Sequence, residues 1–188
     1  MRPSGIYQLK ITLVGSKPPI WRRVQVPASI KLSRLHDVIQ IVMGWTNSHL
    51  HQFFAGNICY SIPDPDDYDF PGQERRDERK FTLCEAAPNE KARLLYEYDF
   101  GDGWEHDLLV EKILPASADA LSAICIGGKN ACPPDDCGGI LGYYHMLDVL
   151  KSPEHPEYDQ YNDWLDEGFK PSYFDLEKTN AAVRRVRV

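Results

Sequence analysis

Three histidines and two aspartates have the types and spacing to bind a metal ion. His49 and His51 are two residues apart in a segment that reads as a strand, so their side chains would share one face. His106 lies in another predicted strand, and Asp99 and Asp102 flank the turn before it. Imidazole and carboxylate ligands suit zinc, manganese or iron. One hypothesis is therefore a metal-dependent hydrolase or nuclease-like enzyme. The divalent transition metal would lower the pKa of a bound water that Asp99 or Asp102 orients.

The same segment also predicts a non-catalytic function, which we place first. Tyr96, Tyr98 and Trp104 stand beside Asp99 and Asp102. Aromatic and polar residues gathered in this way are typical of contact surfaces, so this cluster is expected to contact a protein partner or a small-molecule ligand. The protein would then be a binding or accessory module. Turn aspartates and strand aromatics are also ordinary structural residues, so both functions stay open.

A second metal site can be drawn from the cysteines. Cys125, Cys132 and Cys137, with His145, supply the atoms of a three-sulfur, one-nitrogen zinc site. The gaps of six and four residues are wider than the two-residue gap of common zinc motifs, and proline and glycine pairs in the segment describe a rigid turn. We therefore expect packed, reduced thiols here.

Residues 61–80 are rich in proline and charge and predict a long exposed loop. Asp67, Asp69 and Glu78 nearly spell a calcium-binding loop, but Pro71 occupies a ligand position, so we interpret the stretch as solvated and acidic. Elsewhere the sequence lacks a nucleophile elbow, a phosphate-binding loop, a dinucleotide fingerprint and a zincin helix. The sequence therefore names no common enzyme mechanism.

The elements that must position these residues come in the order strands, then helices. Alternating apolar residues predict strands at 6–14, 20–26, 49–54, 58–60, 94–100 and 104–113. Gly101 to Gly103 would turn the last pair into a hairpin. A helix is expected from Ser33 to Gly44, and others near 140–150, 156–166 and 175–186. This order predicts an α+β fold, with an antiparallel or mixed sheet of hairpins packed with helices that are concentrated in the C-terminal third.

Length and composition narrow the classes of protein. The 188 residues, 43% of them hydrophobic, suit a single domain over residues 1–188. A net charge of −7 opposes general nucleic-acid binding. No secretion signal and no apolar run long enough for a bilayer is visible, which predicts no membrane association. Five cysteines, an odd number, favour reduced thiols and a cytoplasmic location.

Three motifs together resemble one known family. They are Trp45 with HLHQF at 49–53, YEYDFGDGWEH at 96–106, and CPPDDCGG at 132–139 followed by Gly142 and Tyr143. With Ile20 to Arg23 and Leu35-His36, they make the chain similar to the plasmid pRiA ORF-three-like family, also labelled insertion-element passenger TnpR. The resemblance covers nearly the whole chain and implies a protein carried by plasmids, mobile elements and genomes, without an agreed activity. Resolvase chemistry is not expected, because a serine among arginines and a basic helix-turn-helix are both missing.

Overall fold

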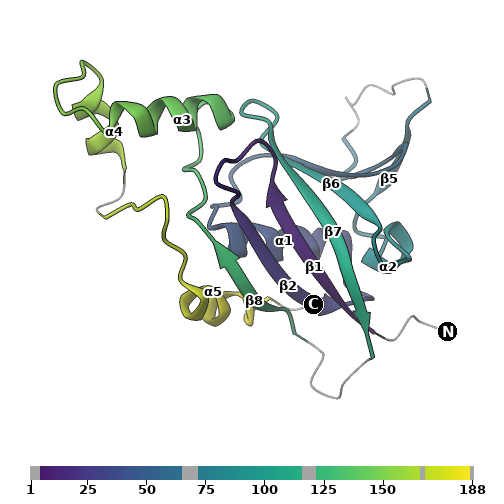
Figure 1. The fold of residues 1–188 in the computed structure, drawn as a ribbon. Coiled ribbons are helices and arrows are strands. Elements are labelled where there is room, and N and C mark those ends of the chain that lie inside the picture. The colour runs from purple at the N-terminus through teal and green to yellow at the C-terminus, as the bar shows by residue number, and fades with distance from the viewer. Residues whose placement is uncertain (1–4, 65–71, 116–121, 166–167, 187–188) are drawn as a thin grey trace.

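A computed structural model describes residues 5–64, 72–115, 122–165 and 168–186 (Figure 1). Within these ranges the chain forms eight strands and five helices, in the order β1 (Ile6–Leu13), β2 (Trp21–Pro27), α1 (Leu32–Met43), β3 (His51–Ala55), β4 (Ile58–Ser61), β5 (Glu74–Asp77), α2 (Leu83–Ala86), β6 (Arg93–Tyr98), β7 (Trp104–Leu114), β8 (Ile124–Lys129), α3 (Gly139–Val149), α4 (Tyr158–Trp164) and α5 (Leu176–Val183).

The strands form one mixed sheet in the order β5-β4-β3-β6-β7-β1-β2-β8. Neighbours are antiparallel except β4 and β5, which are parallel. The expected hairpins β1–β2 and β6–β7 are present, and β1 pairs with β7, so the two hairpins lie side by side. The α+β fold with a mixed sheet is therefore confirmed.

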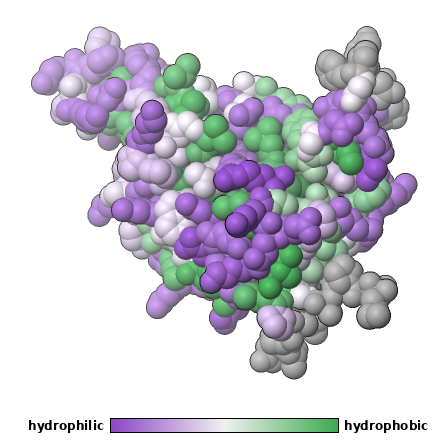
Figure 2. Space-filling model, turned by 45° about the vertical axis from the view of Figure 1, so that its right-hand side comes forward, coloured by the Kyte–Doolittle hydropathy of each residue, from purple (hydrophilic) through white to green (hydrophobic). Residues whose placement is uncertain are grey.

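The alternation along the strands separates a core face from an outer face. In β1, Tyr7, Leu9, Ile11 and Leu13 are buried, as their period of two predicts. The helix α1 covers this face (Figure 1), and its apolar side chains at helical spacing are also buried. On the outer face, hydrophilic side chains gather over the middle of the molecule (Figure 2). The side chains on the core face are consequently shielded from water, except at the ends of the sheet.

Two edge strands were missed by the sequence analysis. Part of the predicted 61–80 loop is the edge strand β5, and Glu78 just after it is buried with 1% of its surface exposed. The other edge strand, β8, contains Cys125 and lies before the expected turn, in a stretch where no strand was predicted. Edge strands have a solvated side, so neither shows an apolar period. The calcium-like pattern begins at Asp67, outside the described residues.

The helices are less concentrated than expected. The longest described helix is α1, with 12 residues, and it lies in the N-terminal third of the chain. Its C-terminus is closed by Gly44 at φ 102°, as predicted. A concentration of helices in the C-terminal third is therefore not confirmed. Of the helices in the described ranges, none has both the length and the apolar character needed to cross a membrane.

Candidate metal centre

Three segments that are far apart in the sequence meet at one end of the sheet. They are the residues after α1, the turn between β6 and β7, and the loop that leads into α3 (Figure 1). Thr46 Oγ1 donates to Asp135 Oδ2 at 2.9 Å, and Gly138 N donates to Asp102 Oδ2 at 3.1 Å. These hydrogen bonds fasten the third segment to the other two. Each segment also carries one of the three motifs that underlie the family resemblance.

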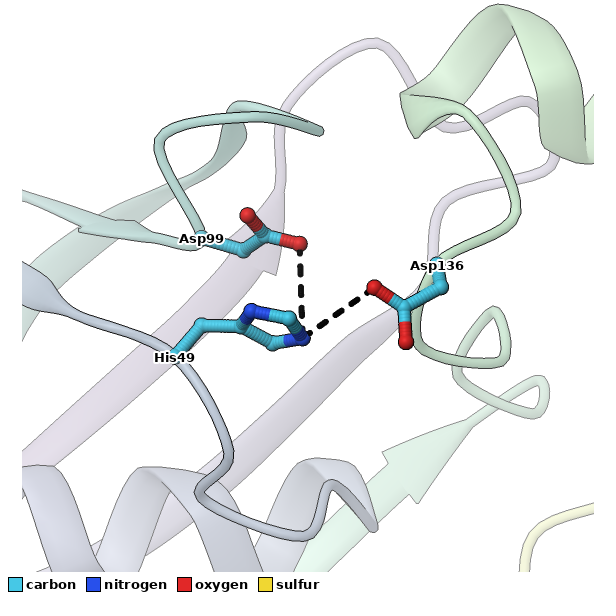
Figure 3. Close-up of side chains that lie close together, drawn as sticks. All are labelled: His49, Asp99 and Asp136. Carbon is cyan, nitrogen blue, oxygen red and sulfur yellow. Dashed lines mark ion pairs between the residues drawn. The ribbon is translucent and has the colours of Figure 1, made fainter.

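Each segment contributes one side chain to a cluster of His49, Asp99 and Asp136 (Figure 3). The Nε2 atom of His49 lies 3.2 Å from Asp136 Oδ1 and 3.7 Å from Asp99 Oδ2, and the three atoms lie within 4.8 Å of one another. Neither contact forms a hydrogen bond, and Nε2 is buried with no hydrogen-bond partner. An imidazole bound to a metal points its lone pair at the ion and not at the other ligands, so this arrangement fits a ligand set.

The backbone around both aspartates is unusual. Asp99 has φ 56° and Asp136 has φ 59°, in the left-handed region that residues with a Cβ seldom adopt. Gly101 N donates to Asp99 Oδ1 at 3.0 Å, which leaves Oδ2 directed to His49. Such conformations cost about 1–3 kcal/mol and persist only where the surroundings impose them. The fold therefore holds both carboxylates at His49 at a cost in stability.

The cluster has a deficit of positive charge. Among the described residues, neither Asp99 nor Asp136 forms an ion pair with a lysine or arginine, and His49 is their shared neighbour. Asp99 is only 7% exposed, so water screens its charge poorly. Two carboxylates and an imidazole held this closely favour a cation between them. In the described ranges, this is the one group of three or more potential ligands that is close enough for a single ion.

The other two predicted histidines are not part of the cluster. His51 begins β3, and its Nε2 lies 3.0 Å from Oε2 of the buried Glu78. His49 precedes the strand, so the two histidines do not share a strand face as the spacing had suggested. His106 is fully buried in β7 and meets the edge of Trp45, with 5.0 Å between ring centroids. The predicted set of His49, His51 and His106 is thus not brought together.

His51 belongs instead to a buried polar network that includes His36. The rings of His36 and His51 are stacked, and a circuit of hydrogen bonds closes around His36. Gln40 Nε2 donates to Tyr96 Oη at 3.0 Å, the hydroxyl faces His36 Nδ1 at 2.8 Å, and His36 Nε2 faces Asn47 Oδ1 at 2.7 Å. Asn47 N donates back to Gln40 Oε1 at 3.0 Å. Every member is satisfied when His36 is neutral with its proton on Nε2.

Burial keeps His36 and His106 uncharged. Desolvation, together with the neighbouring His51, lowers the pKa of His36 from 6.5 to about 4. Desolvation also lowers the pKa of His106 from 6.5 to about 4, while hydrogen bonds to backbone carbonyls act in the opposite direction. Both are therefore neutral packing residues at neutral pH.

The predicted aromatic surface does not exist as a surface. Tyr96, Tyr98 and Trp104 expose 0%, 0% and 1% of their area, because they point from β6 and β7 into the core under α1. Tyr98 stacks on Trp45, with 4.9 Å between centroids, and meets the ring of His49 edge-on. These aromatics form the floor beneath the cluster. Of the five residues predicted for that surface, only Asp99 lies in the cluster, and Asp102 anchors the adjoining loop.

The cysteines do not form a second site. Among the described residues, Cys125, Cys132, Cys137 and His145 are not grouped closely enough to hold an ion, and His145 pairs with Glu157 at 3.0 Å. Cys84, Cys125, Cys132 and Cys137 are free thiols. Desolvation raises the pKa of Cys137 to about 12 and that of Cys132 well above its usual value. Protonated, packed thiols are poor ligands, as expected from the loose spacing.

A cavity of about 670 Å³ adjoins the cluster. Asp136 lines it, so one residue belongs both to the cluster and to the cavity wall. Aromatic side chains from the C-terminal segments make up much of the rest: Trp164, Phe169, Tyr173 and Phe174. An apolar cavity with a few polar groups at its rim is typical of small-molecule sites.

Asp136 is the cluster residue that the sequence analysis did not select. It lies in a quoted motif, but the motif was interpreted as a turn and searched for zinc through its cysteines. The pairing of that motif with the Asp99 turn depends on contacts across 37 positions, which no local period encodes. The signal available was the presence of acidic residues in two of the motifs and of two histidines in the third.

Comparisons with known proteins agree with the resemblance. The sequence model of the family described as plasmid pRiA4b ORF-3-like protein matches residues 5–178. The uncharacterized protein y4hQ of Sinorhizobium fredii is 38% identical over 162 residues, which is 86% of this chain and 81% of that protein. The crystal structure of a protein of unknown function, MM3350 from Methanosarcina mazei Go1, superposes with a TM-score of 0.80 at 37% identity, covering 93% of this chain and 98% of that one.

Proposed function

The chain belongs to the plasmid pRiA4b ORF-3-like family, and because the matched relatives carry no named activity, we propose from the site alone that it is a metal-dependent hydrolase. Its divalent transition metal is held by His49, Asp99 and Asp136. The observation that carries this proposal is the buried His49 Nε2, which has no hydrogen-bond partner and faces two carboxylates without basic partners.

The composition of the site favours catalysis over a structural role for the ion. Three protein ligands leave coordination positions open, whereas structural sites are usually closed by four. A bound divalent ion would supply a water of lowered pKa. Asp135, next to Asp136, has Oδ1 buried without a partner while Oδ2 accepts from Thr46. We assign Asp135 the task of accepting the proton from that water.

The charges around the site favour a small substrate over a nucleic acid. Asp135, Asp136 and Asp175 all line the cavity, and the chain carries a net charge of −7. Both would repel a polyphosphate backbone. The free thiols also support the cytoplasmic location that the sequence predicts, because a reducing compartment preserves them. We therefore propose a cytoplasmic enzyme of small-molecule metabolism.

Metal binding is tested first, by elemental analysis and by titrating Mn²⁺ and Zn²⁺ into chelator-treated full chain. We expect about one ion per chain. Asp136→Asn and Asp99→Asn should weaken binding by about 100-fold or more, since even the residues that only orient ligands cost 10- to 100-fold. Asparagine tolerates positive φ and preserves the turns, so these variants should remain folded. Wild-type protein that takes up neither ion would contradict the proposal.

A matched control separates ligand loss from a general change in charge. Asp148 is an exposed carboxylate on α3 that pairs with Lys151, so Asp148→Asn removes the same charge elsewhere. It should leave metal affinity unchanged. Hydrolysis is tested with p-nitrophenyl acetate and bis(p-nitrophenyl) phosphate on metal-loaded protein. Metal-dependent turnover that is lost in Asp135→Asn, while the ion still binds, is the expected result.

The non-catalytic binding or accessory module remains a second candidate because of the cavity. The cavity could hold a ligand with the ion acting only as an anchor. In that case the wild-type protein would still bind the metal and Asp136→Asn would still weaken that binding, but no substrate would turn over. The two candidates therefore differ in turnover and not in metal content.

A further inference from the structure

Arg22 is a buried cation without an anionic partner. It lies on the core face of β2 and is only 2% exposed, whereas its neighbour Arg23 lies on the outer face and pairs with Glu111 at 2.6 Å. Among the described residues, no carboxylate forms an ion pair with Arg22. An arginine cannot avoid the cost of burying its charge by losing its proton. A buried positive charge without a counter-charge is costly, so the fold retains it at the expense of stability.

Hydrogen bonds occupy one side of the guanidinium and leave the other free. Nε donates to Val42 O at 2.6 Å, and Nη1 donates to Trp21 O at 2.9 Å and to Lys129 O at 3.1 Å. Within the described parts of the chain, Nη2 has no partner. It is also absent from the set of fully enclosed polar atoms without partners. Since Arg22 lines the 670 Å³ cavity, Nη2 is the part of the group that can be reached from it.

The surroundings of Arg22 are built to hold the group still. The ring of Phe174 lies against the guanidinium, 4.1 Å from its carbon to the ring centroid. A side chain at Gly128 would place its Cβ 2.6 Å from Phe174 and 2.9 Å from the Cδ of Arg22. Only glycine therefore permits this stack. A fixed donor beside an aromatic wall is a preorganised site for an anionic group.

We propose that Arg22 binds the carboxylate of a small organic acid whose apolar part fills the aromatic cavity. The charge of the cavity wall selects a monoanion. Arg22 and Lys178 supply two positive charges, and Asp135, Asp136 and Asp175 supply three negative ones. A phosphate dianion would meet this excess of negative charge, whereas a carboxylate needs only the one free donor nitrogen.

The position of the cavity links this acid to the candidate metal centre. Asp136 lines the same cavity, so the far part of a ligand held by Arg22 extends toward the cluster. Identifying the acid as the substrate rests on the proposed function, but its binding to Arg22 does not. The test therefore uses chelator-treated protein, in which failure to bind the acid says nothing about the metal.

The experiment compares phenylacetate with its neutral counterpart phenylacetamide, by calorimetric titration of the full chain. Phenylacetate should bind at least about tenfold more tightly, because only the acid makes a charge-assisted hydrogen bond. Inorganic phosphate at equal concentration should not displace it. Equal affinity for acid and amide, no saturable binding of the acid at about 10 mM, or displacement by phosphate would each overturn the assignment.

Variants locate the site. Arg22→Gln should abolish the preference for acid over amide, and Arg23→Gln is the control, because it removes the adjacent charge from the opposite face of the same strand. Lys178→Met tests whether the exposed lysine at the rim suffices, and it should retain the preference. Loss of the preference in Lys178→Met would move the site to the rim and overturn the proposal. The comparison of acid with amide on wild-type protein stays decisive if Arg22→Gln does not fold.

Discussion

The imidazole rings of His36 and His51 lie face to face, with 3.4 Å between their centroids and 9° between their planes. Two positive charges could not be held in this stack, and the circuit around His36 is satisfied only by the neutral ring. On the other side of the stack, His51 Nε2 lies 3.0 Å from Oε2 of the buried Glu78. The carboxylate, the two rings and Tyr96 form a buried polar layer that ties β3, β5 and α1 together.

Removing Glu78 should destabilise the protein strongly. Glu78→Ala leaves His51 with an empty buried space where a carboxylate stood, at a cost of roughly 3–5 kcal/mol in the free energy of unfolding. Glu78→Gln should cost less, because its amide oxygen can still accept from His51. Urea denaturation measures both. Glu74→Ala, which removes an exposed carboxylate of β5, should change the midpoint little. A Glu78→Ala midpoint as high as that control would show that the pair is not buried.

Stability should fall as the pH drops from about 6.5 to 4. His36 and His106 have folded-state pKa values near 4, below the value of 6.5 expected in the unfolded chain. The unfolded state therefore takes up protons first, so the stabilisation is complete above pH 6.5 and is lost as the pH falls toward 4. Each ring contributes at most about 3 kcal/mol. In His106→Phe one of the two is gone, so the loss between pH 6.5 and 4.5 should shrink, whatever its stability at pH 7. An unchanged slope would contradict the assignment.

Gly139→Ala should weaken metal binding through the loop that carries Asp136. A Cβ at Gly139, where φ is 67°, would lie 2.4 Å from the carbonyl oxygen of Asp102. The loop would have to move away from the β6–β7 turn, and this movement would separate Asp136 from Asp99. We expect a loss of at least about tenfold in affinity for Mn²⁺. Gly56→Ala pays the same left-handed backbone cost, at φ 60° with no close atom, and should bind the ion normally. Equal affinity in both variants would show that the loop position does not matter.

Substituting the cysteines should leave metal content unchanged. The thiols of Cys132 and Cys137 have raised pKa values because of burial, and neither belongs to the cluster. Cys132→Ser and Cys137→Ser should therefore bind as much Mn²⁺ or Zn²⁺ as the parent, and the thiol of Cys137 should react slowly with a disulfide reagent at neutral pH. A loss of zinc but not of Mn²⁺ would reveal a thiolate site.

The sequence predicted the parts of the fold that follow from local periods. The buried side of β1, the hairpin turn at Gly101 to Gly103 and the end of α1 at Gly44 each depend on residues within one element, and each is confirmed. Polar residues next to one another in a strand were harder to place. Arg22 shares the buried face of β2 with Val24, whereas Arg23 lies on the outer face, and the sequence does not show what a charged side chain on the buried face would contact.

One of the three cluster residues could not be predicted, because the cluster is assembled by tertiary contacts. His49 and Asp99 were selected by their chemistry, yet their third partner was Asp136 and not another histidine. His51 contacts Glu78 instead of joining the cluster, and Glu78 lies in a segment with no apolar period. Likewise, the aromatics of β6 carry no mark that separates a core position from a contact surface.

The strand order also sets a time at which the sheet can form during synthesis. The first hairpin has β7 on one side and β8 on the other, so Leu9 pairs with Val110, and Val24 pairs with Cys125. Loops of about 100 residues must close before either pairing gains anything, and such topologies fold slowly. A nascent chain halted before Trp104 would present both edges of β1–β2 unpaired, with Trp21 and the backbone of each strand available to other chains. The ribosome-bound fragment is therefore the state in which this protein is most exposed to aggregation, and the state in which a chaperone would have most to bind.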